Sequence, residues 1–209
     1  MDEKNVIHTE AQLREHYPTT YERAILKVQT RLDKHCRDFI ARSPFLCIGS
    51  SRPDGSADVS PRGDPPGFVH VADDYTLLIP DRPGNNRLDT MTNLLHNPKV
   101  GLIFFIPGVD ETLRVNGDAR IIDDRDELAR FEFRRHVPLV AIAVTVQEAF
   151  LHCAKALRRS KLWDEESKID RKSLARAGDI LSDHVKGGMC GDEVEAYLQK
   201  NYKTGLYND

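Results

Sequence analysis

The feature that most constrains the fold of this 209-residue chain is a run of short apolar segments between residues 45 and 152, each bounded by a turn. Pro53-Asp54-Gly55 has the residue types that tight turns favour, and Pro107-Gly108 ends another segment. Tight hairpins, with long helices only at the two ends, fit an antiparallel barrel better than a parallel βαβ sheet. We therefore expect a mainly β protein with flanking helices, in the α+β class. The expected strands are Phe45–Gly49, Ala57–Ser60, Phe68–Val71, Tyr75–Pro80, Val100–Ile106, Thr112–Ile122 and Leu139–Val146, the last prolonged towards His152.

Helices are expected mainly outside this run of strands. Apolar residues recur at helical spacing from Ala24 to Ile40, which predicts one amphipathic helix that Ser43-Pro44 ends. Between the strands, Asn86 is expected to cap a helix over Arg87–His96. The other expected helices are Asp126–Arg135, Ala154–Ser160, Arg171–His184 and Asp192–Tyr202. The chain is thus expected to divide into an N-terminal helical extension (1–42), a barrel domain (43–163) and a C-terminal helical extension (164–209).

Composition argues against several classes of protein. The formal net charge is −3 and no basic block is present, so a nucleic-acid partner is not expected. The four cysteines are scattered without a C-x-x-C pair, which argues against a disulfide framework and favours a reducing, cytoplasmic compartment. No apolar run approaches the roughly 20 residues of a membrane span, so no membrane partner is expected. The eight histidines lack ligand spacing, so no metal site is expected.

Two cation-bearing turns stand about one hairpin apart. Ser60-Pro61-Arg62-Gly63 ends an extended segment, and Pro83-Gly84-Asn85-Asn86-Arg87 opens a helix. A phosphate monoester carries nearly two negative charges and is bound by guanidinium groups together with hydroxyl or backbone donors. A helix N-terminus also favours an anion. The two turns therefore predict a site for a phosphorylated cofactor, with Ser60, Arg62, Gly63, Asn85, Asn86 and Arg87 as candidate ligands. The alternative is that these arginines are solvated or form ordinary salt bridges.

A second group of candidate residues lies at the strand-to-helix junction 150–163. This segment holds His152, four lysine or arginine residues and the only tryptophan, Trp163. On a helix beginning near residue 154, Lys155 and Arg159 fall on one face at i, i+4, where like charges repel unless an anion lies between them. The alternative is an ordinary basic helix face with Trp163 as a core anchor.

Four ordered motifs carry a resemblance to a known family. They are S-P-R-G-D (60–64), P-G-N-N-R-x-D (83–89), L-R-V-N-G-x-A (113–119) and H-C-x-K-A-x-x-R-S-x-L-W (152–163). Over roughly residues 42–163 the chain resembles the flavin-binding split β-barrel proteins related to pyridoxamine 5′-phosphate oxidase. The resemblance implies a six-stranded split barrel that binds FMN at the interface of a homodimer, and an FMN-dependent oxidoreductase activity.

The same resemblance implies roles for individual residues. The FMN phosphate would be held by Arg62, Asn86 and Arg87. The strand that carries Arg114 and Asn116 would lie along the flavin edge, with Arg114 or Lys155 stabilising the reduced flavin. The segment 152–163, which includes Lys155, Arg159, Ser160 and Trp163, would reach the flavin from the neighbouring subunit. Independently of the resemblance, His152 is the candidate proton donor, because the unperturbed pKa of histidine is near neutrality.

The sequence also departs from the true oxidase. That enzyme ends in an Arg-Leu-x-Pro-type tail that contacts the vitamin phosphate, whereas this chain ends Gly205-Leu206-Tyr207-Asn208-Asp209. Pyridoxamine phosphate is therefore not the expected substrate, and the sequence does not name another. Three alternatives stay open: a protein that binds or senses flavin or haem without turnover, a relative that uses a deazaflavin as cosubstrate, and a dimeric module whose basic helix (155–161) meets an acidic partner.

Overall fold

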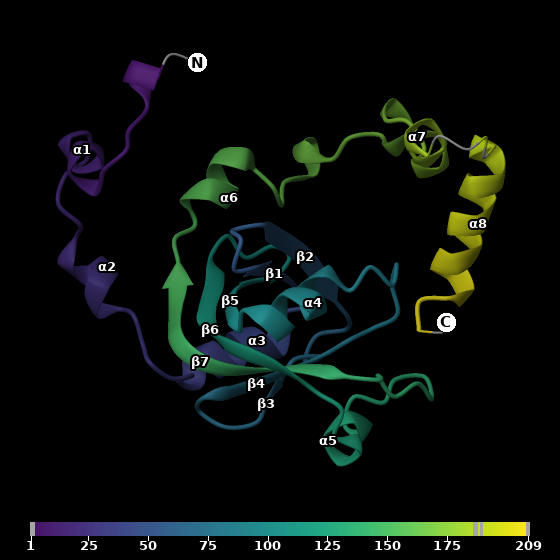
Figure 1. The fold of residues 1–209 in the computed structure, drawn as a ribbon, viewed down its shortest axis with the longest axis horizontal. Helices are drawn as coiled ribbons and strands as arrows, with labels where there is room; N and C mark the ends of the chain where they lie inside the picture. The colour runs from purple at the N-terminus through teal and green to yellow at the C-terminus, as the bar shows by residue number, and fades with distance from the viewer. Residues whose placement is uncertain (1–2, 186–187, 189, 208–209) are drawn as a thin grey trace.

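The computed structural model describes residues 3–185, 188 and 190–207, and its centre is one curved antiparallel sheet (Figure 1). The sheet has seven strands in the order β2-β1-β5-β6-β7-β4-β3. The strands are β1 (Phe45–Ser51), β2 (Ala57–Gly63), β3 (His70–Val71), β4 (Thr76–Pro80), β5 (Lys99–Phe105), β6 (Thr112–Ile122) and β7 (Ala141–His152). The α-helices are α1 (Glu10–Glu15), α2 (Glu22–Leu26), α3 (Lys34–Arg42), α4 (Asp89–His96), α5 (Arg125–Ala129), α6 (Lys155–Ser160), α7 (Ala177–His184) and α8 (Gly191–Thr204). Three short 3₁₀ turns complete the described elements: η1 (Glu3–Asn5), η2 (Glu165–Ser167) and η3 (Arg171–Ser173).

The expected fold class is confirmed: the protein is α+β, with an antiparallel sheet of the split-barrel kind and flanking helices. The sheet has seven strands rather than six, because the two-residue β3 adds an edge beside β4. The β6 register shifts between Asn116 and Gly117, and a Cβ on Gly117 would lie 2.2 Å from the Thr145 carbonyl oxygen. Only glycine allows the two strands to approach so closely at this bulge.

The core lies inside the curve of the sheet and under α3 and α4. Alternate residues of β1, β5 and β6 point inward, and the largest of the fully buried side chains is Phe104. Leu32, Cys36 and Ile40, from and just before α3, pack into the same cluster. The proposed division of the chain at residue 42 stays a prediction, but α3 contributes directly to the core of the barrel.

The predicted helix from Ala24 to Ile40 is wrong as one continuous element. The chain leaves α2 after Leu26 and becomes extended, so that Gln29 pairs with Ala149 of β7 through two backbone hydrogen bonds. Asp33 then caps α3 by accepting a hydrogen bond from the Cys36 amide at 2.8 Å. The helical spacing did not mark one buried stripe, because α2 buries no residue whereas Leu32, Cys36 and Ile40 pack into the core.

The terminal helices, α1 and α2 at one end of the chain and α7 and α8 at the other, lie away from the barrel (Figure 1). The helices α1 and α2 have no buried residue, and α7 and α8 pack mainly against each other. Two expected helices are shorter than predicted: α5 ends at Ala129, and the segment expected as Arg171–His184 divides into η3 and α7. Within the described residues, no helix combines the length and the apolar character that crossing a membrane requires.

Candidate functional site

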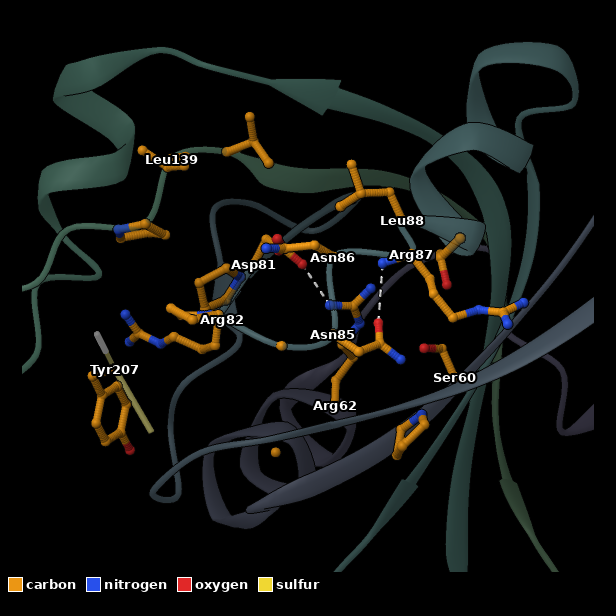
Figure 2. A pocket seen from close by; sticks show the side chains of 18 of the residues that line it. Ser60, Arg62, Asp81, Arg82, Asn85, Asn86, Arg87, Leu88, Leu139 and Tyr207 are labelled. Atoms are coloured by element: carbon orange, nitrogen blue, oxygen red, sulfur yellow. Dashed lines mark hydrogen bonds and ion pairs between the residues drawn. The ribbon is translucent and has the colours of Figure 1, made fainter. Parts of the chain in front are cut away.

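A cavity of about 880 Å³ opens where the two ends of the sheet approach each other. Its walls come from the edge strand β2, the end of β4, the segment 81–90 and residues 136–140 just before β7. Figure 2 shows side chains from these separate segments gathered around one space. The volume lies within the range of about 300–1,000 Å³ that small-molecule and cofactor sites occupy.

The pleat of β2 explains why polar residues line this cavity. Asp58, Ser60 and Arg62 alternate with more exposed residues, and each pairs in register with a buried residue of β1. Directly paired residues of an antiparallel sheet point to the same face. Asp58, Ser60 and Arg62 therefore lie on the same face of the sheet as the core residues of β1. Because β2 is the edge strand, these polar side chains line the cavity instead of the apolar core.

Arg62 connects the two ends of the sheet. Its Nη1 donates to Asp81 Oδ1 at 2.5 Å, and its side chain is only 18% exposed. The Nε of Arg62 is buried and has no hydrogen-bond partner among the described residues. A buried donor left unpaired costs about 1–3 kcal/mol. Arg62 therefore lines the cavity with a guanidinium group whose buried Nε donor is unused within the described chain.

The segment 83–88 forms a turn rather than the first turn of a helix. Asn85 Oδ1 accepts a hydrogen bond from the Arg87 amide at 3.1 Å, and Asn86 and Leu88 both have a φ of 56°. The prediction that Asn86 caps a helix starting at Arg87 is wrong, because Asn86 adopts the left-handed conformation and α4 begins at Asp89. A left-handed leucine is strained, and such strain is often found at binding sites.

The N-terminus of α4 lies at the cavity and has no side-chain cap. Asp89 and Thr90, at the start of the helix, both line the cavity, and Thr90 Oγ1 donates to Asp58 Oδ2 at 3.1 Å. The free amides and the dipole of an uncapped helix start favour an anion. This end of the cavity thus offers backbone donors as well as arginines.

Arg87 differs from Arg62 in its exposure. Its side chain is 72% exposed, and its Nε donates to Asp89 Oδ2 at 2.7 Å. This hydrogen bond raises the pKa of Arg87 and lowers the pKa of Asp89. Because the pair lies in water, its net stabilisation is small and a ligand can replace one partner readily.

Arg82, Asp64 and Tyr207 form a third group at the opposite end of the cavity. Arg82 Nε donates to Asp64 Oδ2 at 2.7 Å, and Tyr207 Oη donates to Asp64 Oδ1 at 2.6 Å. Arg82 and Tyr207 line the cavity. Figure 2 shows them on the side away from Arg87. Burial, and then the hydrogen bond to Asp64, raises the pKa of Tyr207.

Each cavity arginine is therefore paired with a carboxylate of the same chain. Arg62 pairs with Asp81, Arg82 with Asp64 and Arg87 with Asp89. A guanidinium has five N–H donors, so an arginine paired through one or two of them keeps others for a ligand. The cavity lining therefore has no excess of positive charge from these residues, but its three guanidinium groups keep N–H donors beyond those used in the ion pairs.

The predicted site residues divide into two sets in space. The cavity set lines the cavity, and its members are Ser60, Arg62, Gly63, Asn85, Asn86 and Arg87. The junction set does not line it, and its members are Arg114, Asn116, His152, Lys155, Arg159, Ser160 and Trp163. Within one chain, the structure brings the first set together and leaves the second set apart from it.

The strand part of the junction set lies on the outer face of β6 and β7. The Arg114 guanidinium is 5.7 Å from the centroid of the Phe150 ring, and Asn116 Nδ2 donates to Glu148 Oε2 at 3.0 Å. The His152 ring is 6.4 Å from the ring of Phe150. These side chains alternate with buried residues that face the core.

The helix part of the junction set lies on and beyond α6. Lys155, Arg159 and Ser160 are exposed, and Trp163 Nε1 donates to the Val109 carbonyl oxygen at 2.9 Å. Other cations of this segment are paired locally, Arg158 with Asp110 and Lys161 with Glu166. The result is a half-exposed polar surface rather than an enclosed site.

The sequence reasoning missed three residues that shape the cavity: Asp81, Arg82 and Tyr207. Asp81 and Arg82 stand between the end of β4 and the Pro83 turn, so a reading that extended the turn motif by two residues would have included them. No pattern in the sequence connects Tyr207 with Asp64, which is 143 residues away. Among the described residues, no cluster of three or more His, Cys, Asp or Glu side chains could hold a metal ion.

Comparison with known proteins gives one family and several distant structures. The family model described as Pyridoxamine 5'-phosphate oxidase matches residues 32–153, which is more than half of the 209-residue chain. A search of the curated proteins found no match.

Three solved structures illustrate the structural similarity. HupZ from Group A Streptococcus is 17% identical, covers 57% of this chain and 92% of its own, and gives a TM-score of 0.47. A putative pyridoxamine 5'-phosphate oxidase from Lactobacillus delbrueckii is 18% identical, covers 58% of this chain and 95% of its own, and gives a TM-score of 0.45. An FMN-binding protein from Syntrophomonas wolfei is 10% identical, covers 68% of this chain and 96% of its own, and gives a TM-score of 0.43. At these scores the structures add no argument about the site.

Proposed function

Because this chain belongs to the pyridoxamine 5'-phosphate oxidase family, we propose that it is an FMN-dependent oxidoreductase that acts on a small molecule as a homodimer. The observation that supports this most is the convergence of β2 and the segment 83–90 on one cavity. These two segments bring guanidinium groups, side-chain amides and the uncapped start of α4 to the same place. That combination suits a phosphate monoester.

The phosphate of FMN would bind at the Arg62–Arg87 end of the cavity. Arg62 offers a buried Nε that has no partner among the described residues, and Arg87 offers an exposed charge at the rim. Ser60 and Asn86 line the same end and add polar groups. At Gly84 a Cβ would meet no atom within 4 Å, so the turn leaves open space for a ligand.

A second copy of the chain would complete the site. The junction set lies outside the cavity of its own chain, so its polar groups can serve a bound flavin only across an interface. The rim of the cavity also carries exposed apolar side chains, Leu88 and Leu139 among them, which an apposed subunit would cover. We propose that Arg114 or Lys155 of the second copy places positive charge near the flavin ring.

FMN, when bound, supplies the hydride transfer, and the protein supplies binding, orientation and charge. In this chain the proposed proton donor is His152, since imidazole is the side chain suited to moving a proton near neutral pH. Its position at the end of β7, beside Phe150, places it on the outer face of the sheet. Its contribution therefore depends on the proposed dimer.

The alternative of a basic helix that binds an acidic partner is less well supported. Arg158 and Lys161 already pair with Asp110 and Glu166 of the same chain. An acidic partner would have to compete with these carboxylates. A flavin-binding protein without turnover differs from the proposal only in its kinetics, so turnover must be measured.

The proposal is tested by comparing FMN with riboflavin, which lacks the phosphate. Protein purified without added cofactor is expected to be yellow, and after the flavin is removed FMN should bind about a hundredfold more tightly than riboflavin because of the charged hydrogen bonds to phosphate. The measurement is quenching of flavin fluorescence during titration. Equal affinity for the two flavins, or no binding of either, would overturn the phosphate assignment.

Turnover is tested separately on the holoprotein. Reduction by NADH or NADPH under anaerobic conditions, followed by reoxidation when an electron acceptor is added, is expected for an oxidoreductase. Tight binding of FMN without reduction by either nucleotide would favour a storage or sensing role instead.

A further inference from the structure

The segment 205–207 returns from α8 to the barrel and reaches the cavity. Tyr207 is half-buried at the cavity wall, although α8 itself packs mainly against α7. In Figure 1 the yellow end of the chain lies on the same side as the loops that enclose the cavity, and in Figure 2 Tyr207 lies beside Arg82. We call residues 205–207 the strap.

The strap is held by one hydrogen bond and by its aromatic ring. Tyr207 Oη donates to Asp64 at 2.6 Å, and the ring lies 4.8 Å from that of Phe133. The guanidinium groups of Arg82 and Arg134 lie 5.5 Å and 5.6 Å from the ring centroid. Aromatic pairs and cation–π contacts of this kind add to the stability of a packed aromatic ring. The contacts come from three separate segments of the chain, which makes the docking specific.

Asp64 is the anchor of this arrangement. Its side chain is 1% exposed, so its charge must be compensated by partners. One oxygen accepts from Arg82 Nε and the other from Tyr207 Oη. Arg82 also donates through Nη2 to the Phe131 carbonyl oxygen at 3.0 Å. Arg82 is thus fixed by Asp64, by Phe131 and by the ring of Tyr207.

We propose that the strap closes the end of the cavity opposite Arg87, and that Tyr207 is a positioning residue that holds Arg82 in the cavity wall. The strap sets how much room a ligand finds at that end and how easily a bound molecule leaves. The remaining lining there is His136, Val137, Pro138 and Leu139, a mainly apolar wall. A small molecule that reacts beside a flavin bound at the Arg62 end would meet this wall, Arg82 and Tyr207. The contact of a reacting small molecule with this wall rests on the proposed function, whereas the docking of the strap does not.

The experiment compares three variants of the full chain. Tyr207→Phe removes only the hydrogen bond to Asp64, and Tyr207→Ala removes the ring as well. Tyr202→Ala is the matched control, because Tyr202 is 55% exposed on α8 and does not line the cavity. Thermal unfolding of each variant checks that the barrel stays folded.

Hydrogen–deuterium exchange without any ligand tests the docking itself. Backbone amides of residues 131–137 are expected to exchange about tenfold faster in Tyr207→Ala, because the strap no longer packs on this loop. Tyr207→Phe should have a smaller effect and Tyr202→Ala none. Equal exchange in Tyr207→Ala and Tyr202→Ala would show that the strap is not docked and would overturn the inference.

Release of bound FMN tests the closure. The dissociation rate and the quenching of flavin fluorescence by iodide are expected to rise about tenfold in Tyr207→Ala and about threefold in Tyr207→Phe, with no change in Tyr202→Ala. Faster amide exchange without faster release or stronger quenching would mean that the strap only stabilises the loop, which overturns the closure. If the unaltered protein binds no FMN, the proposed function fails, and amide exchange of residues 131–137 still decides whether the strap is docked.

Discussion

The cavity set and the junction set have similar composition but very different surroundings. Both combine arginines with small polar residues next to the start of a helix. The cavity set is enclosed, because β2, the turn at 83–88 and residues 136–140 meet around it. The junction set lies on the outer face of β6 and β7 and on the exposed α6. The difference shows that similar residues form an enclosed cavity only where separate segments of the chain surround them.

The comparison also indicates where a second copy would matter. A single chain encloses the end of the cavity where phosphate is proposed to bind, but not the surface that carries Arg114 and His152. Loss of a cavity residue should therefore weaken binding at any protein concentration. Loss of a junction residue should weaken binding only where two copies associate.

The largest expected effect is that of Arg62→Ala. We expect FMN affinity to fall by about a hundredfold, equivalent to about 2.8 kcal/mol, because a largely buried guanidinium and its free Nε are removed. Arg87→Ala should cost roughly tenfold, because Arg87 is exposed and paired with Asp89. The measurement is fluorescence titration with FMN. Affinity for riboflavin should change much less in both variants.

Arg120→Ala is the control for this pair, since Arg120 is exposed on β6 and does not line the cavity. If Arg120→Ala lowered the affinity for FMN as much as Arg62→Ala does, the lower affinity would reflect the overall charge of the protein rather than the cavity. If Arg62→Ala bound FMN normally, the cavity set would not be the phosphate site.

The fold could be predicted because short-range patterns determine it. Alternating apolar residues and turn residues located β1, β2, β4, β5, β6 and β7 to within a few residues. The helices were predicted less well. The apolar spacing from Ala24 to Ile40 does not reveal that Gln29 leaves the helix to pair with Ala149, 120 residues later in the sequence, since that pairing depends on where β7 lies.

The candidate site shows the same limit. Arg62 and Arg87 could be connected with one cavity because each stands in a turn motif beside a regular element. The carboxylate partner of Arg62 could not be assigned, because Asp81 meets Arg62 only after the two ends of the sheet approach each other. The contact of Tyr207 with Asp64 depends on the path of α7 and α8, which local spacing does not fix.

The second prediction concerns the junction set and has an intermediate effect. In Lys155→Ala combined with Arg159→Ala, we expect FMN affinity to fall by roughly tenfold at high protein concentration, where a second copy would bring these charges to the flavin. The difference in FMN affinity between the double variant and the unaltered protein should become smaller at protein concentrations below the dissociation constant of the dimer. Sedimentation velocity run beside the titration gives the fraction of dimer.

Arg158→Ala is the matched control for the double variant. Arg158 lies on the same helix and has the same charge, but it is already paired with Asp110 of its own chain. It should change FMN affinity little. The junction set would not contact the flavin if the loss of FMN affinity were the same at every protein concentration. The same conclusion would follow if Arg158→Ala lost as much affinity as the double variant.

The smallest expected effect is on the reactivity of Cys153, the thiol next to His152. Thiolates react, so Cys36, whose pKa burial raises to about 11, should stay unlabelled by iodoacetamide near pH 8. Cys153 and Cys190 are exposed in one chain and should both be labelled.

If a second copy covers the junction set, labelling of Cys153 should slow by about two- to threefold as protein concentration rises, because the reagent reaches only the dissociated fraction. Cys190 serves as the internal reference and should keep its rate, and mass spectrometry of the labelled peptides measures both. Parallel behaviour of the two thiols at all concentrations would mean that the junction set stays open to solvent, and the cavity would then have to bind its ligand with the residues of one chain.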